Sequence, residues 1–292
     1  MSFAIVTDTA ANLPQLYLNR HDITTVPFTF LLDGKEFDYT CPDTFDSHTY
    51  YDAIRAGARV TTSQINPDRY MDYMRPILKR GKNILFVGVS SGVSGAFSSA
   101  QLAASQLREE FPERTIRLVD SLSAALGEGL LVLKAALCRN EGLNLENTAR
   151  QLEEFRTRIY HLFTVDDLQH LNRSGRISGL TAAIGTVLGI KPLLKGSDEG
   201  KIVASDKARG RKKVLSMMAQ KYAALVSDAK NHLVAISHAD CPDDAEKLAD
   251  MIRAECEPQD VIVTRHEPAT GGHIGPGALA LFFVGAPGVR KK

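Results

Sequence analysis

The chain has 292 residues, of which 44% are hydrophobic and 24% are charged, and this composition is typical of a globular protein and not of a disordered or collagen-like one. The 35 Lys and Arg residues nearly balance the 34 Asp and Glu residues, giving a net charge of +1, so no overall field attracts nucleic acid or an anionic membrane. Because a single core rarely exceeds roughly 250–300 residues, we expect two domains with a cleft between them.

Short β-branched runs alternate with segments of helical period, which is typical of an α/β fold. In the first half, we expect strands at 3–7, 84–89 and 116–119, and helices at 96–111 and 122–137. A polar stretch at 140–151 predicts a connecting helix, and we place a boundary near residue 155, which gives domains 1–155 and 156–292. In the second half, we expect strands at 159–163, 201–205, 233–237 and 261–264, and helices at 212–227 and 242–256.

Several classes of protein are excluded by missing motifs. The four cysteines form no C-x-x-C pair, and the start of the chain resembles no signal peptide, so we expect a reduced, cytoplasmic protein. The longest apolar run, 277–286, is about half of the roughly 20 residues that a membrane helix needs, and we expect it in the core. No H-E-x-x-H motif or Cys/His cluster occurs, so no metal site is predicted.

Hydroxyl and Asp side chains gather where four segments of the first half end. They occur at Thr7-Asp8-Thr9, at Thr61-Thr62-Ser63-Gln64, from Ser90 to Gly95, and at Asp120-Ser121. At the carboxyl ends of strands in an open α/β sheet, such residues aim hydroxyls and backbone N–H groups at an anion. Each group alone is better explained as a helix N-cap. Four in one half, with two glycines beside Ser94, favour a binding site for the polar head of a ligand.

No nucleotide-binding motif matches this region. Residues 88–95 follow the spacing G-x-x-x-G-x-x-G and not the dinucleotide pattern, and no P-loop occurs, so we expect no nucleotide cofactor. Ser94 has glycine two residues before it but Ala96 two residues after it, which breaks the nucleophile elbow of hydrolases. The chain order Ser94, Asp120, His273 nevertheless matches that of α/β-hydrolases, so a serine esterase stays an alternative.

The second half contributes a histidine and several cations. Five of the seven residues 271–277 are Gly or Pro, which predicts a bent loop that presents His273 to a cleft; the alternative is a turn histidine that bonds its own loop. An Asp-capped short helix runs into a glycine turn, where Arg173 and Arg176 could bind an anion or the carboxylates of a partner.

A second group of cations lies within residues 207–213, at Lys207, Arg209, Arg211, Lys212 and Lys213. A solvated helix start is the ordinary explanation, but cations there oppose the helix dipole. A regulatory or nucleic-acid-binding role for this stretch stays an alternative, although the balanced overall charge argues against it.

Together these segments resemble the DegV family of fatty-acid-binding proteins, the acyl-carrying subunits of fatty acid kinase, over almost the whole chain. The family landmarks occur in order as TDTAANLP at 7–14, TSQI at 62–65, SSGVSGAF at 90–97, DS at 120–121, DDLQHLNRSGRI at 166–177, IKP at 190–192, the basic stretch at 207–213 and HIGPG at 273–277. No single segment is specific, but the ordered set is. Ser174 replaces the first glycine of the Arg176 turn.

The resemblance implies two three-layer α/β/α domains that hold a long-chain fatty acid in an apolar tunnel between them, without a cofactor. It implies that Thr62, Ser94 and the Gly95 backbone bind the carboxylate. The rest of the implied ligand site is Ser63, Ser121, Thr9 and His273. The protein would be a carrier and not an enzyme, and a separate kinase subunit, docking near Arg176 and Arg209, would phosphorylate the carboxylate. The implied partners include no nucleic acid and no membrane.

Overall fold

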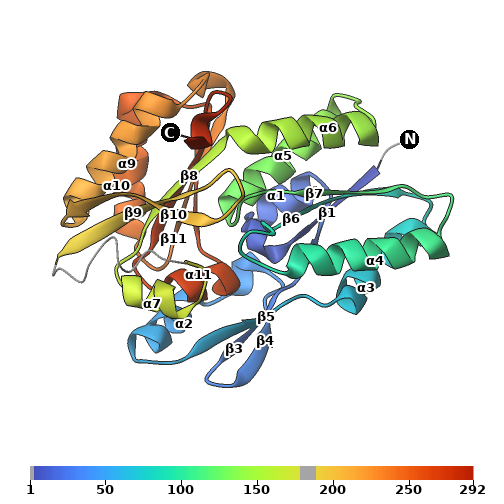
Figure 1. Ribbon diagram of the computed structural model, residues 1–292, viewed down its shortest axis with the longest axis horizontal. Helices are drawn as coiled ribbons and strands as arrows, with labels where there is room; N and C mark the ends of the chain where they lie inside the picture. The colour runs from blue at the N-terminus through green and yellow to red at the C-terminus, as the bar shows by residue number, and fades with distance from the viewer. Residues whose placement is uncertain (1–2, 178–188, 292) are drawn as a thin grey trace.

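The computed structural model describes residues 3–177 and 189–291, which form three sheets and the helices around them (Figure 1). The first sheet is parallel, with the strand order β2-β1-β6-β7. Its strands are β1 (Phe3–Asp8), β2 (Ile23–Val26), β6 (Asn83–Gly88) and β7 (Ile116–Asp120). Three of these confirm predicted strands. All six residues of β1 are buried, as a central parallel strand with helices on both faces requires.

Helices cover both faces of this parallel sheet. The helices α3 (Pro67–Lys79) and α4 (Ala96–Glu110) pack on one face, and α5 (Leu126–Asn140) and α6 (Leu145–Phe155) pack on the other. The predicted helix at 122–137 begins late because Leu122 and Ala125 both have a φ of 51°, a left-handed conformation that a helix cannot contain.

The second sheet has the strand order β10-β9-β8-β13-β11-β12. Its strands are β8 (Ile159–Thr164), β9 (Ile190–Gly196), β10 (Ile202–Arg209), β11 (Leu233–His238), β12 (Asp260–Arg265) and β13 (Leu279–Val284). Only β11 and β12 pair in parallel. The apolar run at 277–286 supplies the fully buried strand β13, which confirms its place in the core. The strand β9 was not predicted. The helices α9 (Arg211–Leu225) and α10 (Pro242–Glu255) cover one face.

The opposite face of the second sheet is covered by α5, so the two large sheets share this helix as a common layer. One apolar cluster joins residues of β1 and β6 through α5 to residues of β8, β11 and β13. A helix between two sheets must be apolar on nearly all of its sides. Helix α5 meets this requirement with the sequence LGEGLLVLKAALCRN. The core therefore crosses the boundary that we expected near residue 155, and the boundary itself stays a prediction.

A small antiparallel sheet, with the order β4-β3-β5, was not predicted. Its strands are β3 (Thr29–Leu32), β4 (Lys35–Asp38) and β5 (Val60–Ser63). The remaining helices are α1 (Gln15–Arg20), α2 (Ser47–Arg55), α7 (Leu168–Arg173), α11 (Pro268–Ile274) and the short 3₁₀ turns η1 (Thr9–Ala11), η2 (Pro42–Thr44), η3 (Arg156–Arg158), η4 (Ala229–Asn231) and η5 (Val289–Lys291). The sheet places β5 beside α11. No described helix is long and apolar enough to span a membrane.

Candidate functional site

A pocket of about 580 Å³ opens where β5, α7 and α11 meet, and we call it the mouth pocket. It brings together Thr62, Arg176 and His273, three of the predicted site residues, from segments far apart in the chain. Its full lining is Ile54, Gly57, Ala58, Arg59, Val60, Thr61, Thr62, His170, Arg173, Ser174, Arg176, Gly272 and His273.

Thr62 and His273 form a direct pair, with 2.8 Å between Thr62 Oγ1 and His273 Nε2. Burial, together with the charges of Arg176 and His170, lowers the pKa of His273 to about 4. The imidazole is therefore neutral near pH 7 and carries a single N–H. The pair joins β5 to α11 across the wall of the pocket.

The predicted loop around His273 is wrong, because His273 lies in the last turn of α11. Glu267 caps this helix and accepts hydrogen bonds from the N–H groups of Ala269 (2.6 Å) and Thr270 (2.5 Å). Pro268 occupies the first turn. An acceptor side chain followed by proline is a helix-start signal that could have predicted α11, but the glycine content of 271–277 outweighed it.

The mouth pocket is rich in cations. Arg59, Arg173, Arg176 and two histidines line it, and none of the described residues in its lining is acidic. Arg173 contacts Asp167 at 3.6 Å outside this lining. The Arg176 guanidinium donates to the Ser174 carbonyl, and burial lowers its pKa. A concave surface with several cations and no lining carboxylate is suited to an anion.

Ser94 and Gly95 lie at the start of α4, next to β5. Ser94 Oγ accepts a hydrogen bond from Ala96 N at 3.2 Å, within the turn that leads into α4. Gln64 Nε2 donates to the Gly95 carbonyl at 3.0 Å and to Ser99 Oγ at 2.7 Å. A Cβ atom at Gly95 would lie 2.3 Å from Gln64 Oε1, so only glycine permits this approach. Gln64 thus ties the strand that carries Thr62 to the turn that carries Ser94.

The other predicted hydroxyls differ in their surroundings. Ser63 is exposed on β5. Thr9 is buried, and its Oγ1 accepts from Phe28 N at 2.9 Å. Ser121 is also buried, and its Oγ donates to the Ser123 carbonyl at 3.0 Å. Thr9 and Ser121 therefore already have backbone partners.

The residues of the alternative esterase triad have other partners. Asp120 Oδ2 accepts from Ser91 Oγ at 2.5 Å, and His273 pairs with Thr62. Within residues 3–177 and 189–291, no hydrogen bond links Ser94, Asp120 and His273. The arrangement therefore gives no support to a serine nucleophile, which needs a base within hydrogen-bond reach.

A second, smaller cavity of about 90 Å³ lies between the second sheet, helix α11 and the segments that follow β6 and β7, and we call it the inner cavity. Most of its wall is apolar, and the lining residues come from both halves of the chain: Val93, Ser123, Ala124, Ala125, His161, Phe163, Gly196, Gly200, Lys201, Ile202, His266, Thr270, Ile274, Ala280 and Phe282. Ser90 Oγ donates to the Gly200 carbonyl at 2.9 Å, which holds the β9–β10 turn against the first half.

Helix α11 separates the two hollows. Thr270 and Ile274, one helical turn apart, line the inner cavity, whereas Gly272 and His273 line the mouth pocket. This seven-residue helix therefore has one face toward an apolar space and another toward a cationic one.

The five cations at 207–213 are divided between two elements. Lys207 and Arg209 belong to β10, and the other three begin α9. Arg211 pairs with Asp244 at 2.8 Å and with Asp166 at 3.5 Å. Arg209 is exposed and is not among the residues that line the mouth pocket.

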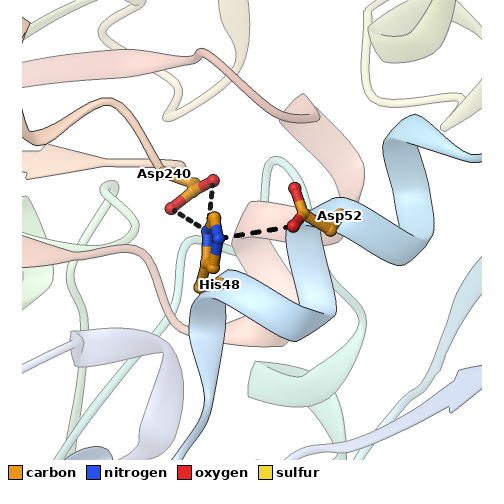
Figure 2. A group of neighbouring side chains, drawn as sticks. All are labelled: His48, Asp52 and Asp240. Carbon is orange, nitrogen blue, oxygen red and sulfur yellow. Dashed lines mark hydrogen bonds and ion pairs between the residues drawn. The ribbon is translucent and has the colours of Figure 1, made fainter.

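One group of potential metal ligands lies at the surface (Figure 2). His48, Asp52 and Asp240 place their ligand atoms within 4.8 Å of one another. Arg55 Nη1, however, is 2.8 Å from Asp52 Oδ1 and 2.5 Å from Asp240 Oδ2. Because this guanidinium already pairs with both carboxylates, we interpret the group as an ion-pair network that joins α2 to the segment after β11, and we assign it no metal.

Comparison with known proteins places this arrangement in a family. Residues 2–286 match the family model described as "Uncharacterised protein, DegV family". A DegV domain-containing protein of Clostridium perfringens is 36% identical over 283 residues, covering 97% of both chains.

Two solved structures are also similar. A fatty-acid-binding DegV protein from Thermus thermophilus is 30% identical, with a TM-score of 0.89 over 98% of this chain and 100% of that one. One from Streptococcus agalactiae is 29% identical, with a TM-score of 0.86 over 98% and 99%. Since the family model and these relatives extend over nearly the whole chain, the protein belongs to the DegV family.

Proposed function

We propose that the protein binds a long-chain fatty acid, with its carboxylate at the mouth pocket and part of its hydrocarbon chain in the inner cavity. The observation that carries this proposal is the position of α11, which has a cationic hollow on one face and a mostly apolar hollow on the other. Such a pair of environments is complementary to an amphiphile with an anionic head. The related proteins from Thermus thermophilus and Streptococcus agalactiae are described as fatty-acid-binding, which supports the same ligand class.

The carboxylate requires hydrogen-bond donors when it leaves water. Thr62 supplies a hydroxyl at the pocket wall, and Ser94 and the Gly95 backbone are tied to the same strand through Gln64. We propose these three as the primary carboxylate ligands, with His273 polarising Thr62. Ser63, Ser121 and Thr9 complete the proposed site, and the last two act by holding the strand-end turns in shape.

The hydrocarbon chain supplies most of the affinity. Burial of each methylene contributes about 0.8 kcal/mol, so a 16-carbon chain gains on the order of 10 kcal/mol before entropy costs. Retention of the ligand through purification follows from that magnitude.

We further propose that the protein is a cytoplasmic carrier without catalytic residues or a cofactor, which presents the bound carboxylate to a separate kinase subunit for acyl-phosphate formation. Arg176 lines the mouth pocket, where it would face the carboxylate and the docked subunit. Arg209 is exposed on β10 and would contact the subunit alone.

Mass spectrometry of the denatured, purified protein tests the ligand. We expect a fatty acid in the extract and binding of added fatty acid by the stripped protein; absence of both would overturn the proposal. For the partner, Arg209→Ala should leave fatty-acid affinity unchanged and strongly reduce acyl-phosphate formation with the cognate kinase subunit. Equal loss of both would assign Arg209 to the ligand site instead.

A further inference from the structure

Two polar side chains in the wall of the inner cavity have no hydrogen-bond partner among the described residues. They are Ser123, whose Oγ is enclosed between β7 and α5, and His161 on β8, whose Nε2 is enclosed as well. Ser123 is only 1% exposed. A buried polar group without a partner costs about 1–3 kcal/mol. Both groups therefore destabilise the fold unless something in the cavity satisfies them.

The two side chains belong to one part of the wall, because both pack beside Phe282. The His161 and Phe282 rings stack, with centroids 6.2 Å apart and an angle of 28° between their planes. A Cβ atom at Gly127 would lie 2.1 Å from Ser123 Oγ and 2.8 Å from Phe282 Cδ1. The hydroxyl and the Phe282 ring thus converge on the same glycine.

Space for the imidazole depends on Gly196. A Cβ atom at that position would lie 2.2 Å from His161 Cε1 and 2.4 Å from Nε2, so any other residue on this part of β9 would displace the ring. Burial, assisted by the positive charge of Arg290, holds the pKa of His161 well below its usual value. A neutral imidazole has one N–H donor and one lone pair. The ring therefore brings both hydrogen-bonding roles to a wall that is otherwise mostly hydrocarbon.

We propose that Ser123 and His161 form a polar recognition point that selects acyl chains carrying an oxygen, as a hydroxyl or oxo group, partway along the hydrocarbon. This inference rests on the proposed fatty-acid-binding function. A hydroxyl both donates and accepts, so it can pair with the serine hydroxyl as well as with the imidazole. A saturated chain in the cavity leaves both groups without a hydrogen-bond partner. A double bond offers only its π-electrons, which are a weak hydrogen-bond acceptor.

The test compares 18-carbon acids of equal length on the stripped, full-length protein. Stearic acid, oleic acid and a series of hydroxystearic acids with the hydroxyl at successive carbons are titrated by calorimetry. A hydroxyl buried without partners weakens binding. We expect most isomers to bind more weakly than stearic acid and one or two neighbouring isomers to bind at least as tightly. The position of the optimum measures the distance from the carboxylate to the recognition point.

Two variants assign the effect to these side chains. Ser123→Ala and His161→Phe should each weaken the best isomer by roughly 3- to 10-fold while leaving stearic acid unchanged or tighter. Val93→Ala, which alters an apolar part of the same wall, should change all chains by the same factor. Ser123→Ala removes only one oxygen atom, so it decides the question if His161→Phe does not fold.

Two results would overturn the inference while leaving fatty-acid binding intact. One is a series in which no isomer approaches stearic acid, as expected if a retained water molecule satisfies both groups. The other is an equal change for stearic acid and the best isomer in both variants. Failure of every acid to bind the wild type would overturn the proposed function together with the inference.

Discussion

The mouth pocket and the inner cavity lie on two faces of the same helix but are built in opposite ways. The mouth pocket, at about 580 Å³, is lined by arginines and histidines. The inner cavity, at about 90 Å³, has a mostly apolar wall with Ala, Val, Ile and Phe side chains, and it includes two unpartnered polar groups. The first is suited to recognising charge and the second to recognising shape. Under the proposed function, the mouth pocket would supply the orientation of the ligand and the inner cavity its affinity, so substitutions should affect the two separately.

Removing the two hydroxyls proposed to bind the carboxylate should have the largest effect. The double substitution Thr62→Val and Ser94→Ala would delete both proposed bonds, each worth about 1–3 kcal/mol. We expect fatty-acid affinity to fall by roughly 30-fold or more while the melting temperature changes little. Calorimetric titration measures this, with Thr157→Val, an exposed threonine on η3, as the matched control. Near-native affinity in the double variant would refute the assignment.

A larger side chain in the inner cavity should weaken the binding of long acyl chains more than that of short ones. Ala124 lines this cavity, and Ala124→Leu adds three carbons, which displace methylenes worth about 0.8 kcal/mol each. We expect a loss of about 2 kcal/mol, roughly 30-fold, for an 18-carbon acid and little loss for octanoic acid. Ala254→Leu, on the exposed face of α10, is the control. Equal losses for both acids would show that the tail lies elsewhere.

The buried carboxyl that caps α11 should make the free energy of unfolding depend on pH. Burial raises the pKa of Glu267 from its ordinary 4.5 to about 7, so the native state keeps a proton that the unfolded state releases between these values. The free energy of unfolding should therefore decrease as pH rises from about 4.5 to 7, by at most about 1.4 kcal/mol per pH unit for each such group. Asp8, whose pKa burial also raises to about 7, acts in the same direction.

Glu267→Gln should make this pH dependence shallower, since the amide does not titrate. Urea denaturation across pH 5–8 measures the slope. Glu255→Gln, at an exposed position on α10, should leave the slope as it is in the wild type. An unchanged slope in Glu267→Gln would show that this carboxyl is ionised throughout.

The smallest effect is expected at the surface network of Figure 2. Arg55 is 42% exposed in its side chain, and exposed ion pairs contribute about 0–1 kcal/mol. Arg55→Ala should lower the free energy of unfolding by less than about 1 kcal/mol, and added salt should reduce the difference. Fatty-acid affinity should not change. A loss of affinity would instead make α2, which lines the mouth pocket through Ile54, part of the binding machinery.

Much of the fold followed from local pattern. The buried strands β1, β6 and β13 are continuous apolar runs, and α4 combines an apolar stripe with a charged face. Such signals depend only on the period of the residues along the chain. The small sheet was not predicted because its strands have only four residues each, too few to show a clear hydrophobic period. Helix α11 was not predicted because the two glycines in its interior are more typical of a loop.

The sequence by itself determined the α/β class, the positions of most of the main strands along the chain and the residue types of a polar site. Only the tertiary structure decided that Thr62 and His273, 211 positions apart, form a pair, that Arg176 reaches the same pocket while Arg209 does not line it, and that α5 serves both large sheets. The physical reason is that period and propensity are local properties. The convergence of side chains depends on how whole elements pack, and packing is set by shape and burial over the entire chain.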